Sequence, residues 1–441
     1  MISGKTIICL ASGWDYHPTS KHHIMRELSK QNHVIWVNWH ASRRPGVAWS
    51  DLRHIVSRLG QIRQGARQVS DAITVLTPWQ VPLPGWRLAG RFNALMVRRA
   101  VHKILGNLPP MPVQIWSFAP DVAELIGNLD LDEELIVYYC VDAFGEFPGY
   151  DRELIERLER ELLSKCDLVI TTSRPLYEKR QRLHSNIHLL QHGVDHAHLS
   201  RALHGHLPIP PELRDLPRPI LGYVGVIGSW VNLDLVAGLA QATPNASVVL
   251  VGPEQTSRGP CAGLPNVHWL GPRAHQVLPN YLRCFDVGLI PFRHVPLAYN
   301  ANPIKLYEYL AAGVPVVSTS LPAVELLPGA VWLADDVGET VACCAQAIEQ
   351  NREADRRSRS ELMRAESWSA RLEHISNLVA ATLGEHPGTG SAEGTWAPKV
   401  TPARQPAPVG VDCRTADRYC VGPGGRLSIS AWPDPGETGR K

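Results

Sequence analysis

Residues 302–319, NPIKLYEYLAAGVPVVST, carry side chains suited to binding a negatively charged ligand. Asn302 followed by Pro303 is typical of a helix N-cap and first turn, where free backbone N–H groups attract anions. Lys305 adds a positive charge to that turn. Glu308 follows one turn later, where a carboxylate can accept hydrogen bonds from ribose hydroxyls. The alternative is an ion pair between Lys305 and Glu308 on the helix surface, at i,i+3 spacing.

A glycine-containing turn is the second candidate for binding phosphate. Residues 221–229, LGYVGVIGS, form an apolar run that ends in two glycines. Gly225 and Gly228 lack a Cβ atom, so their backbone can approach a diphosphate closely. Glycines also mark ordinary turns, and the spacing alone does not separate these two interpretations.

The N-terminal half holds candidates for binding a second substrate. Gly13 follows the first apolar run of the chain, and Asp142 follows another such run within residues 138–149, YYCVDAFGEFPG. A carboxylate at Asp142 could orient or deprotonate a hydroxyl group. Alternatively, it caps a turn or a helix. His22 and His23 open a helical pattern, where packing is the simpler interpretation.

Short apolar runs alternate with helical patterns along most of the chain, which predicts α/β architecture with parallel sheets. Helices are expected over 21–31 and 150–165. The alternation starts again after a Pro- and His-rich stretch at 202–219, so we expect two Rossmann-like domains with a ligand site in a cleft between them. The expected strands are 6–11, 33–37, 113–117, 135–139, 168–172, 187–190, 220–224, 247–251, 267–270, 287–290 and 314–318.

The 441 residues are too many for one core, and we expect several segments. The last segment contains 17 Pro plus Gly in 57 residues, a composition that predicts a disordered tail. The expected segments are an N-terminal domain (1–200), a linker (201–218), a C-terminal domain (219–366), a closing helix (367–384) and the tail (385–441).

The overall net charge of +2 and the 20% charged residues are ordinary for a globular protein and give no sign of a nucleic-acid partner. Residues 41–105 differ, because they contain eleven Lys or Arg and only two Asp. This stretch, which includes Arg91, Arg98 and Arg99, is either a solvated face or a patch for anionic lipid or a pyrophosphate-linked acceptor.

The nine cysteines lack metal-ligand spacing, which indicates free thiols in a reducing compartment and no metal site. We find no signal-peptide pattern, and no stretch approaches the ~20 apolar residues of a membrane span. We therefore expect a cytoplasmic protein, with peripheral contact possible at the inner face of the cell membrane.

Residues 302–319 resemble the donor-site signature of family 4 glycosyltransferases with the GT-B fold, in which a helix bearing a Glu precedes small residues and G-x-P-V. Residues 221–229, 284–293 (CFDVGLIPFR) and 191–195 (QHGVD) resemble other segments of that family in the same order. Residues 138–149 resemble a bacterial surface polysaccharide branch of the teichuronic-acid type. The resemblance covers about residues 5–384.

The resemblance implies a hexosyl-type transferase that moves a sugar with retention from a nucleotide diphosphate sugar to a polysaccharide or lipid-linked acceptor, without a metal or other cofactor. The C-terminal domain would bind the donor and the N-terminal domain the acceptor. The implied catalytic residues are Asp142, Lys305 and Glu308, and the implied donor-binding residues are Gly13, Gly225, Gly228, Arg293, Asn302, Lys305 and Glu308.

The chain departs from the family pattern at the diphosphate. Where the family carries Arg and Lys after the glycine turn, this chain has Val226 and Val231, and Asn300 stands in place of a Glu. Because leaving-group charge must still be neutralised, Arg293 and Lys305 are expected to replace the missing side chains. Two alternatives stay open: a sugar-nucleotide 2-epimerase of the same fold, and a catalytically inactive partner subunit.

Overall fold

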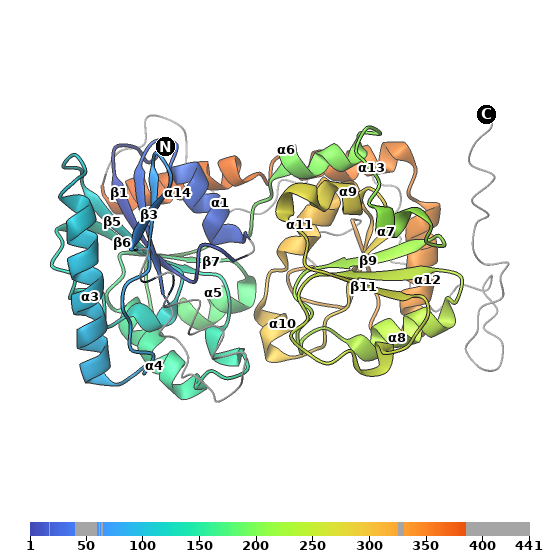
Figure 1. Cartoon of the computed structure of the whole chain (residues 1–441), viewed down its shortest axis with the longest axis horizontal. Coiled ribbons are helices and arrows are strands. Elements are labelled where there is room, and N and C mark those ends of the chain that lie inside the picture. Colours follow the sequence, from blue (N-terminus) through green and yellow to red (C-terminus); the bar gives the residue numbers. More distant parts are fainter. Residues whose placement is uncertain (17, 40–59, 61, 63–64, 325–329, 385–441) are drawn as a thin grey trace.

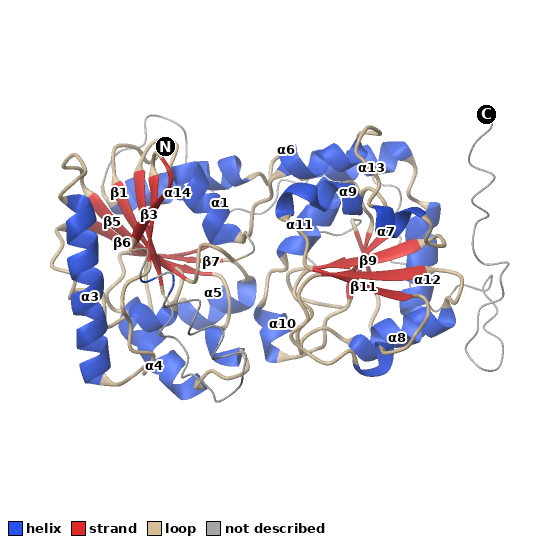
Figure 2. Cartoon of the chain, in the orientation of Figure 1, coloured by secondary structure: helices blue, strands red, loops and turns tan. Residues whose placement is uncertain are grey.

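The computed structural model describes residues 1–16, 18–39, 60, 62, 65–324 and 330–384. These residues form two α/β domains that lie side by side, each built on a mainly parallel sheet (Figure 1, Figure 2). The expected tail lies outside the described residues, as do five of the basic residues noted above: Arg43, Arg44, Arg53, Arg58 and Arg63.

The N-terminal sheet has the strand order β3-β4-β2-β1-β5-β6-β7-β8. All neighbours pair in parallel except β3 with β4. Every residue of the central strand β1 is buried, as expected for a parallel strand covered on both faces. The strands are β1 (Thr6–Ala11), β2 (His33–Asn38), β3 (Ala66–Ser70), β4 (Ile73–Leu76), β5 (Val113–Ser117), β6 (Glu133–Cys140), β7 (Leu168–Thr171) and β8 (Ile187–Leu189).

The helices of this domain pack on the two faces of its sheet (Figure 2). They are α1 (Ser20–Leu28), α3 (Arg87–Leu105), α4 (Arg152–Leu163) and α5 (Arg174–Arg180), with the short 3-10 helices η1 (Pro120–Val122) and η2 (Phe144–Glu146). The six strands and two helices expected in this half are confirmed with small shifts at their ends. The strands β3 and β4 were not expected, because β3 is polar and exposed and β4 has four residues.

The C-terminal sheet is wholly parallel, in the order β11-β10-β9-β12-β13-β14. Three strands match the expected bounds residue for residue: β9 (Ile220–Val224), β10 (Ser247–Val251) and β12 (Val287–Ile290). The other strands are β11 (Val267–Gly271), β13 (Val316–Ser318) and β14 (Val331–Leu333).

Helices surround this second sheet as well (Figure 1). They are α6 (His196–Leu199), α7 (Pro211–Arg214), α8 (Leu233–Ala242), α9 (Leu278–Leu282), α10 (Pro296–Asn300), α11 (Ile304–Ala311), α12 (Val337–Glu349) and α13 (Glu353–Leu362), with the 3-10 helices η3 (Ser200–Leu203), η4 (Gly259–Cys261) and η5 (His275–Val277).

Residues 201–218, expected as a linker, pack against the C-terminal domain instead. Ala202 and Leu213 are buried in its hydrophobic core. Arg273 donates a hydrogen bond of 2.9 Å to Glu212. The Pro- and His-rich composition concealed these buried side chains, so the expectation of a separate linker is wrong.

The last described helix, α14 (Trp368–Thr382), returns to the N-terminal domain, where it lies beside α1 (Figure 1). Its buried apolar side chains join the core that includes β1 and β2, and these are Trp368, Leu372, Ile375 and Val379. The backbone N–H of Ile2 donates to Ser376 Oγ at 3.2 Å. The chain therefore crosses between the domains twice, before α6 and before α14.

Candidate active site

Helix α11 carries Lys305 and Glu308, and its start differs from the expected one. The N-cap residue is Pro303, and no side chain caps the helix. Asn302 is buried and donates from Nδ2 to the carbonyl oxygen of Thr172 in the N-terminal domain, at 2.9 Å. The expectation of Asn302 as the N-cap is therefore wrong, because its side chain is used to join the two domains.

The glycine turn after β9 makes room for Lys305. Gly225 has a φ of +145°, a conformation that favours glycine. A Cβ atom at Gly225 would overlap Cε of Lys305 and lie 2.5 Å from its Nζ. Lys305 Nζ also lies 5.8 Å from the centre of the Tyr223 ring. The end of β9 and the start of α11 therefore meet where the lysine crosses the turn.

The turn is held by backbone contacts with the next strand. The N–H of Gly225 donates to the carbonyl oxygen of Val251 at 2.8 Å. A Cβ atom at Gly252 would overlap the carbonyl oxygen of Gly225. The two strand ends can approach this closely because both positions are glycine.

Gly228 has a packing role in the described structure. A Cβ atom there would overlap the ring of Trp230. That ring in turn makes an edge contact with Phe147 of the N-terminal domain, with 6.3 Å between ring centres. Gly228 therefore allows Trp230 to reach across to the other domain.

Asp142 lies just beyond β6, and the charges of lysines from both domains affect its pKa. Burial raises the pKa of Asp142 to about 6, and the charges of Lys21 and Lys305 oppose that rise. Lys21 belongs to the first turn of α1, and its Nζ donates to Ser12 Oγ, next to Gly13. The structure thus brings Gly13, Lys21, Asp142 and Lys305 to one region between the domains.

The four charged groups of this region, Lys21, Asp142, Lys305 and Glu308, are all partly buried. Burial lowers the pKa of each lysine, while Asp142 acts in the opposite direction on both. Burial raises the pKa of Glu308, against the charge of Lys305. Perturbed, partly buried charges that converge from two domains are typical of a binding or catalytic site.

The alternative of a surface ion pair between Lys305 and Glu308 does not describe the structure. Neither side chain is exposed, and among the described residues no ion pair within 4.0 Å joins them. Lys21 was expected to open a helix, together with His22 and His23, but no role at the site was assigned to it. Its sequence spacing does not show that it lies near Asp142, because only the folded chain brings the two together.

Arg293 takes a different partner from the one expected. Its Nη2 donates to Asp234 Oδ2 of α8 at 2.6 Å, and both side chains are exposed. Its charge is therefore balanced on the surface of the C-terminal domain. This exposed pair with Asp234 was not expected, and the prediction that Arg293 joins Lys305 at the diphosphate stays a prediction.

The two histidines at the start of α1 are packing residues. His22 accepts from the N–H of Thr19 at 3.1 Å and contacts the carbonyl oxygen of Trp14 at 3.1 Å. Burial lowers the pKa of His22 to about 3, so the ring is neutral. His23 stacks on Trp368 of α14, with 5.3 Å between ring centres.

The basic residues Arg91, Arg98 and Arg99 are exposed on α3. Arg98 forms an ion pair with Asp130. Figure 1 shows α3 along the outer side of the N-terminal domain, away from the C-terminal domain. The structure therefore keeps these arginines apart from Lys305 and Glu308.

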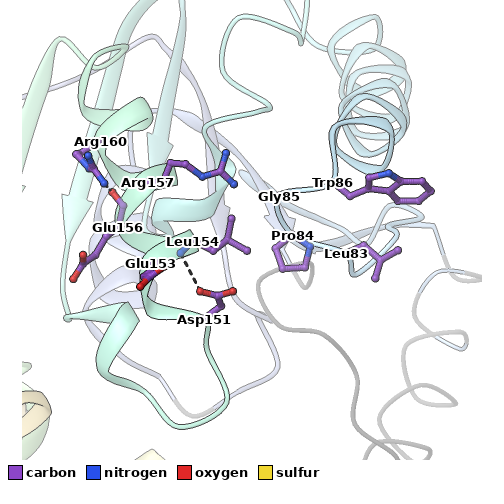
Figure 3. A pocket seen from close by; sticks show the side chains of 10 residues that line it. All are labelled: Leu83, Pro84, Gly85, Trp86, Asp151, Glu153, Leu154, Glu156, Arg157 and Arg160. Atoms are coloured by element: carbon purple, nitrogen blue, oxygen red, sulfur yellow. Dashed lines mark hydrogen bonds between the residues drawn. The ribbon is translucent and has the colours of Figure 1, made fainter.

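A hollow of about 910 Å³ lies within the N-terminal domain (Figure 3). One wall is the loop before α3, and the other is the start of α4. Its lining residues are Leu83, Pro84, Gly85, Trp86, Asp151, Glu153, Leu154, Glu156, Arg157 and Arg160. Neither Asp142 nor Lys21, Lys305 or Glu308 is among them, so this hollow is separate from the region around Asp142.

Within the described part of the chain, no helix has the length and apolar character needed to cross a membrane. The described residues also contain no group of three or more His, Cys, Asp and Glu that could hold a metal ion.

Comparisons with known proteins find glycosyltransferases. Residues 218–350 match the family model described as Glycosyl transferases group 1. The putative teichuronic acid biosynthesis glycosyltransferase TuaH of Bacillus subtilis (strain 168) is 23% identical over 312 residues, which are 65% of this chain and 78% of that protein. This chain is a glycosyltransferase of the GT-B type.

Solved structures support the GT-B fold of this glycosyltransferase. Sucrose-phosphate synthase from Thermosynechococcus elongatus is 16% identical with a TM-score of 0.61, covering 87% of this chain and 100% of that one. Anabaena HepE in complex with UDP and glucose is 14% identical with a TM-score of 0.60, covering 85% of this chain and 99% of that one. The expected GT-B fold is confirmed, and the match to TuaH agrees with the expected resemblance to bacterial polysaccharide glycosyltransferases.

Proposed function

We propose that this glycosyltransferase moves a hexosyl group, with retention, from a nucleotide diphosphate sugar to a polysaccharide or lipid-linked acceptor. The C-terminal domain would bind the donor and the N-terminal domain the acceptor. The observation that carries the proposal is the convergence of Lys21 and Asp142 with Lys305 and Glu308 from opposite domains. The complexes of HepE with UDP and with UDP-glucose support this class of donor.

Lys305 is proposed to neutralise the donor diphosphate. Its ammonium group lies at the glycine turn, where the backbone around Gly225 can approach phosphate oxygens closely. Positive charge at this point stabilises the nucleoside diphosphate as it leaves, because the charge on its oxygens grows in the transition state. Lys21 supplies a second positive charge from the N-terminal domain. The two lysines thus compensate for Val226 and Val231, which stand where the family carries Arg and Lys.

Glu308 is proposed to accept hydrogen bonds from the ribose hydroxyls. It lies one turn beyond Lys305 on α11, so the two side chains can contact adjacent parts of one nucleotide. Burial that raises its pKa also strengthens a hydrogen bond between a carboxylate and a hydroxyl.

Asp142 is proposed to orient the acceptor hydroxyl. With a pKa of about 6 it is ionised at neutral pH, so it can accept a hydrogen bond from that hydroxyl. In a retaining transfer the departing phosphate lies on the same side as the incoming acceptor and can take its proton. Lysines fill the electrostatic role of a metal in this scheme, and we propose that the transfer needs no cofactor.

A catalytically inactive partner subunit is the second candidate. The departures at Val226, Val231 and Asn300 favour it, and so does the ion pair of Arg293 with Asp234, which balances the arginine's charge. The lysines and carboxylates gathered between the domains favour the transferase. We propose that the protein acts in the cytoplasm at the inner face of the membrane.

Thermal-shift titration with common nucleotides and nucleotide sugars tests the donor site. Stabilisation by nucleotides of one base is expected. Glu308→Ala should weaken that affinity about tenfold or more, because hydrogen bonds to a charged group contribute roughly 1.5–3 kcal/mol.

Glu361→Ala is the matched control, since Glu361 lies on α13 with 63% of its side chain exposed. If Glu308→Ala bound the nucleotide with unchanged affinity, Glu308 would not be a donor-binding residue. No response to any nucleotide would favour the inactive partner over the transferase.

A further inference from the structure

The outer face of α3 combines exposed apolar and basic side chains. We propose that this face, with Trp79 and Trp86 from the preceding loop, inserts into the headgroup region of an anionic lipid bilayer. The inference deepens the proposed function, on which it rests for a lipid-linked acceptor.

Large hydrophobic side chains are concentrated on this face. Six of the fourteen that are exposed among the described residues fall between residues 79 and 95. On α3 itself, Leu88 is 61% exposed, Phe92 42% and Leu95 40%. Their i, i+4 and i+7 spacing places them in one stripe. A contiguous exposed apolar patch of this kind marks an interaction surface.

The loop before the helix adds two exposed indole rings near the start of α3. Trp79 is 57% exposed and Trp86 is 51% exposed. In Figure 3, Trp86 and Leu83 lie on the wall of the hollow that faces α4. Tryptophan favours the membrane–water interface, where its ring contacts apolar chains and its N–H contacts water or headgroups.

Positive charge flanks the apolar stripe. Helix α3 contains five Lys or Arg and no Asp or Glu in its 19 residues. Arg87, Arg91 and Arg98 recur at i, i+4 and i+11, so they follow one edge of the stripe. The opposite face of the helix packs into the domain through Ala94 and Val97. A basic helix with one apolar, unburied face is typical of a segment that lies in the plane of a membrane.

The charges favour an anionic bilayer over a second copy of this chain. In a symmetric dimer the same patch meets itself, so the arginines of one α3 would face those of the other. The helix itself carries no carboxylate, and of the arginines along the stripe Arg98 pairs with Asp130 outside the helix. Anionic headgroups supply negative charge for Arg87 and Arg91, while the acyl region accepts Leu88 and Phe92. Docking through α3 also leaves the region around Lys305 uncovered, since α3 lies on the outer side of the N-terminal domain (Figure 1).

Flotation of the full chain with vesicles tests the inference. The vesicles are pure phosphatidylcholine or phosphatidylcholine with phosphatidylglycerol, at low and high salt. The variant is the triple substitution Leu88→Gln, Phe92→Gln and Leu95→Gln, which keeps every charge. The matched control is Leu183→Gln with Leu362→Gln, since these leucines are 52% and 51% exposed elsewhere on the surface.

We expect the full chain to bind the anionic vesicles, the triple variant to partition at least tenfold more weakly, and the control to match the unmodified chain. Circular dichroism checks that both variants are folded. If the triple variant bound vesicles as well as the unmodified chain, and high salt abolished the binding of both, the contact would be purely electrostatic. That result would overturn the insertion of apolar side chains. A dimer in solution that disappears in the triple variant, without vesicle binding, would assign the face to a second copy instead.

The nucleotide titration separates this inference from the proposed function. The triple variant should show the same nucleotide-induced stabilisation as the unmodified chain. If the unmodified chain did not bind vesicles but was still stabilised by a nucleotide, only the membrane contact would be overturned. Vesicle binding without any nucleotide response would overturn the transferase and leave the surface assignment standing.

Discussion

Replacing Gly225 with alanine perturbs the donor site without changing any charge. The added methyl group would overlap Cε of Lys305 and lie 2.5 Å from Nζ, so the lysine must leave the turn. The φ of +145° also disfavours alanine. Gly225→Ala therefore tests whether the position of Lys305 determines donor affinity.

The two effects have separate magnitudes. Backbone strain at such a position costs roughly 1–3 kcal/mol of stability. Loss of a charge-assisted contact between Lys305 and the diphosphate costs roughly 1.5–3 kcal/mol of binding free energy, or about ten- to a hundredfold in affinity. Gly263→Ala is the control for strain, because Gly263 has a φ of +78° and nothing within 4 Å of an added Cβ atom.

Isothermal titration with the nucleotide that stabilises the protein measures the binding effect. Gly225→Ala should lose affinity while Gly263→Ala keeps it, although both variants melt at lower temperature. In a double-mutant cycle, adding Gly225→Ala to Lys305→Met should cause little further loss, because the lysine is already absent. Wild-type affinity in Gly225→Ala, or full additivity with Lys305→Met, would refute the view that this glycine acts through Lys305.

Two further predictions concern Asp142 and a buried ion pair. Because burial raises the pKa of Asp142 from 3.8 to about 6, the folded protein binds more protons than the unfolded chain between these values, and this group makes stability fall as pH rises. Between pH 4 and pH 7, the free energy of unfolding of Asp142→Asn should therefore rise by up to about 3 kcal/mol relative to that of wild type, as measured by urea unfolding. If the free energies of unfolding of the two proteins changed in parallel with pH, Asp142 would not be the cause. Glu159→Gln should destabilise the fold by roughly 3–5 kcal/mol with nucleotide affinity unchanged, because Arg180 is buried and contacts Glu159, whose side chain is 14% exposed, at 2.8 and 2.9 Å. Thermal melting measures the loss of stability, with Glu178→Gln as the control, because the exposed pair of Glu178 with Arg174 should contribute no more than about 1 kcal/mol. Equal losses of stability in the two variants would contradict a larger contribution from the Glu159–Arg180 pair.

The strands were predicted where local sequence and burial agree. The continuous apolar runs of β9, β10 and β12 match strands buried along their whole length. The polar edge strand β3 has no such run, because one side of it faces solvent. Residues 201–218 were misread for a related reason, since their few buried side chains stand among exposed proline and histidine.

In the candidate site, too, local sequence features were predicted and contacts between distant residues were not. Lys305 and Glu308 belong to one helix, so their spacing and their resemblance to a family signature were visible in the chain. Asn302 was wrongly predicted as the N-cap, because its hydrogen-bond partner Thr172 is distant in sequence. The contact of Arg293 with Asp234 was not foreseen for the same reason. Lys21 was expected only at the start of a helix, because nothing local shows that it lies near Asp142.

The amino-acid sequence by itself determined the two parallel sheets and the helix with Lys305 and Glu308, because periodicity, glycine positions and helix spacing are local properties. Only the tertiary structure decided which charges meet. Lys21 and Asp142 reach Lys305 from another domain, and burial between the domains shifts their pKa values. Coulomb interaction and desolvation depend on distance through space, which the order of residues along a chain does not specify.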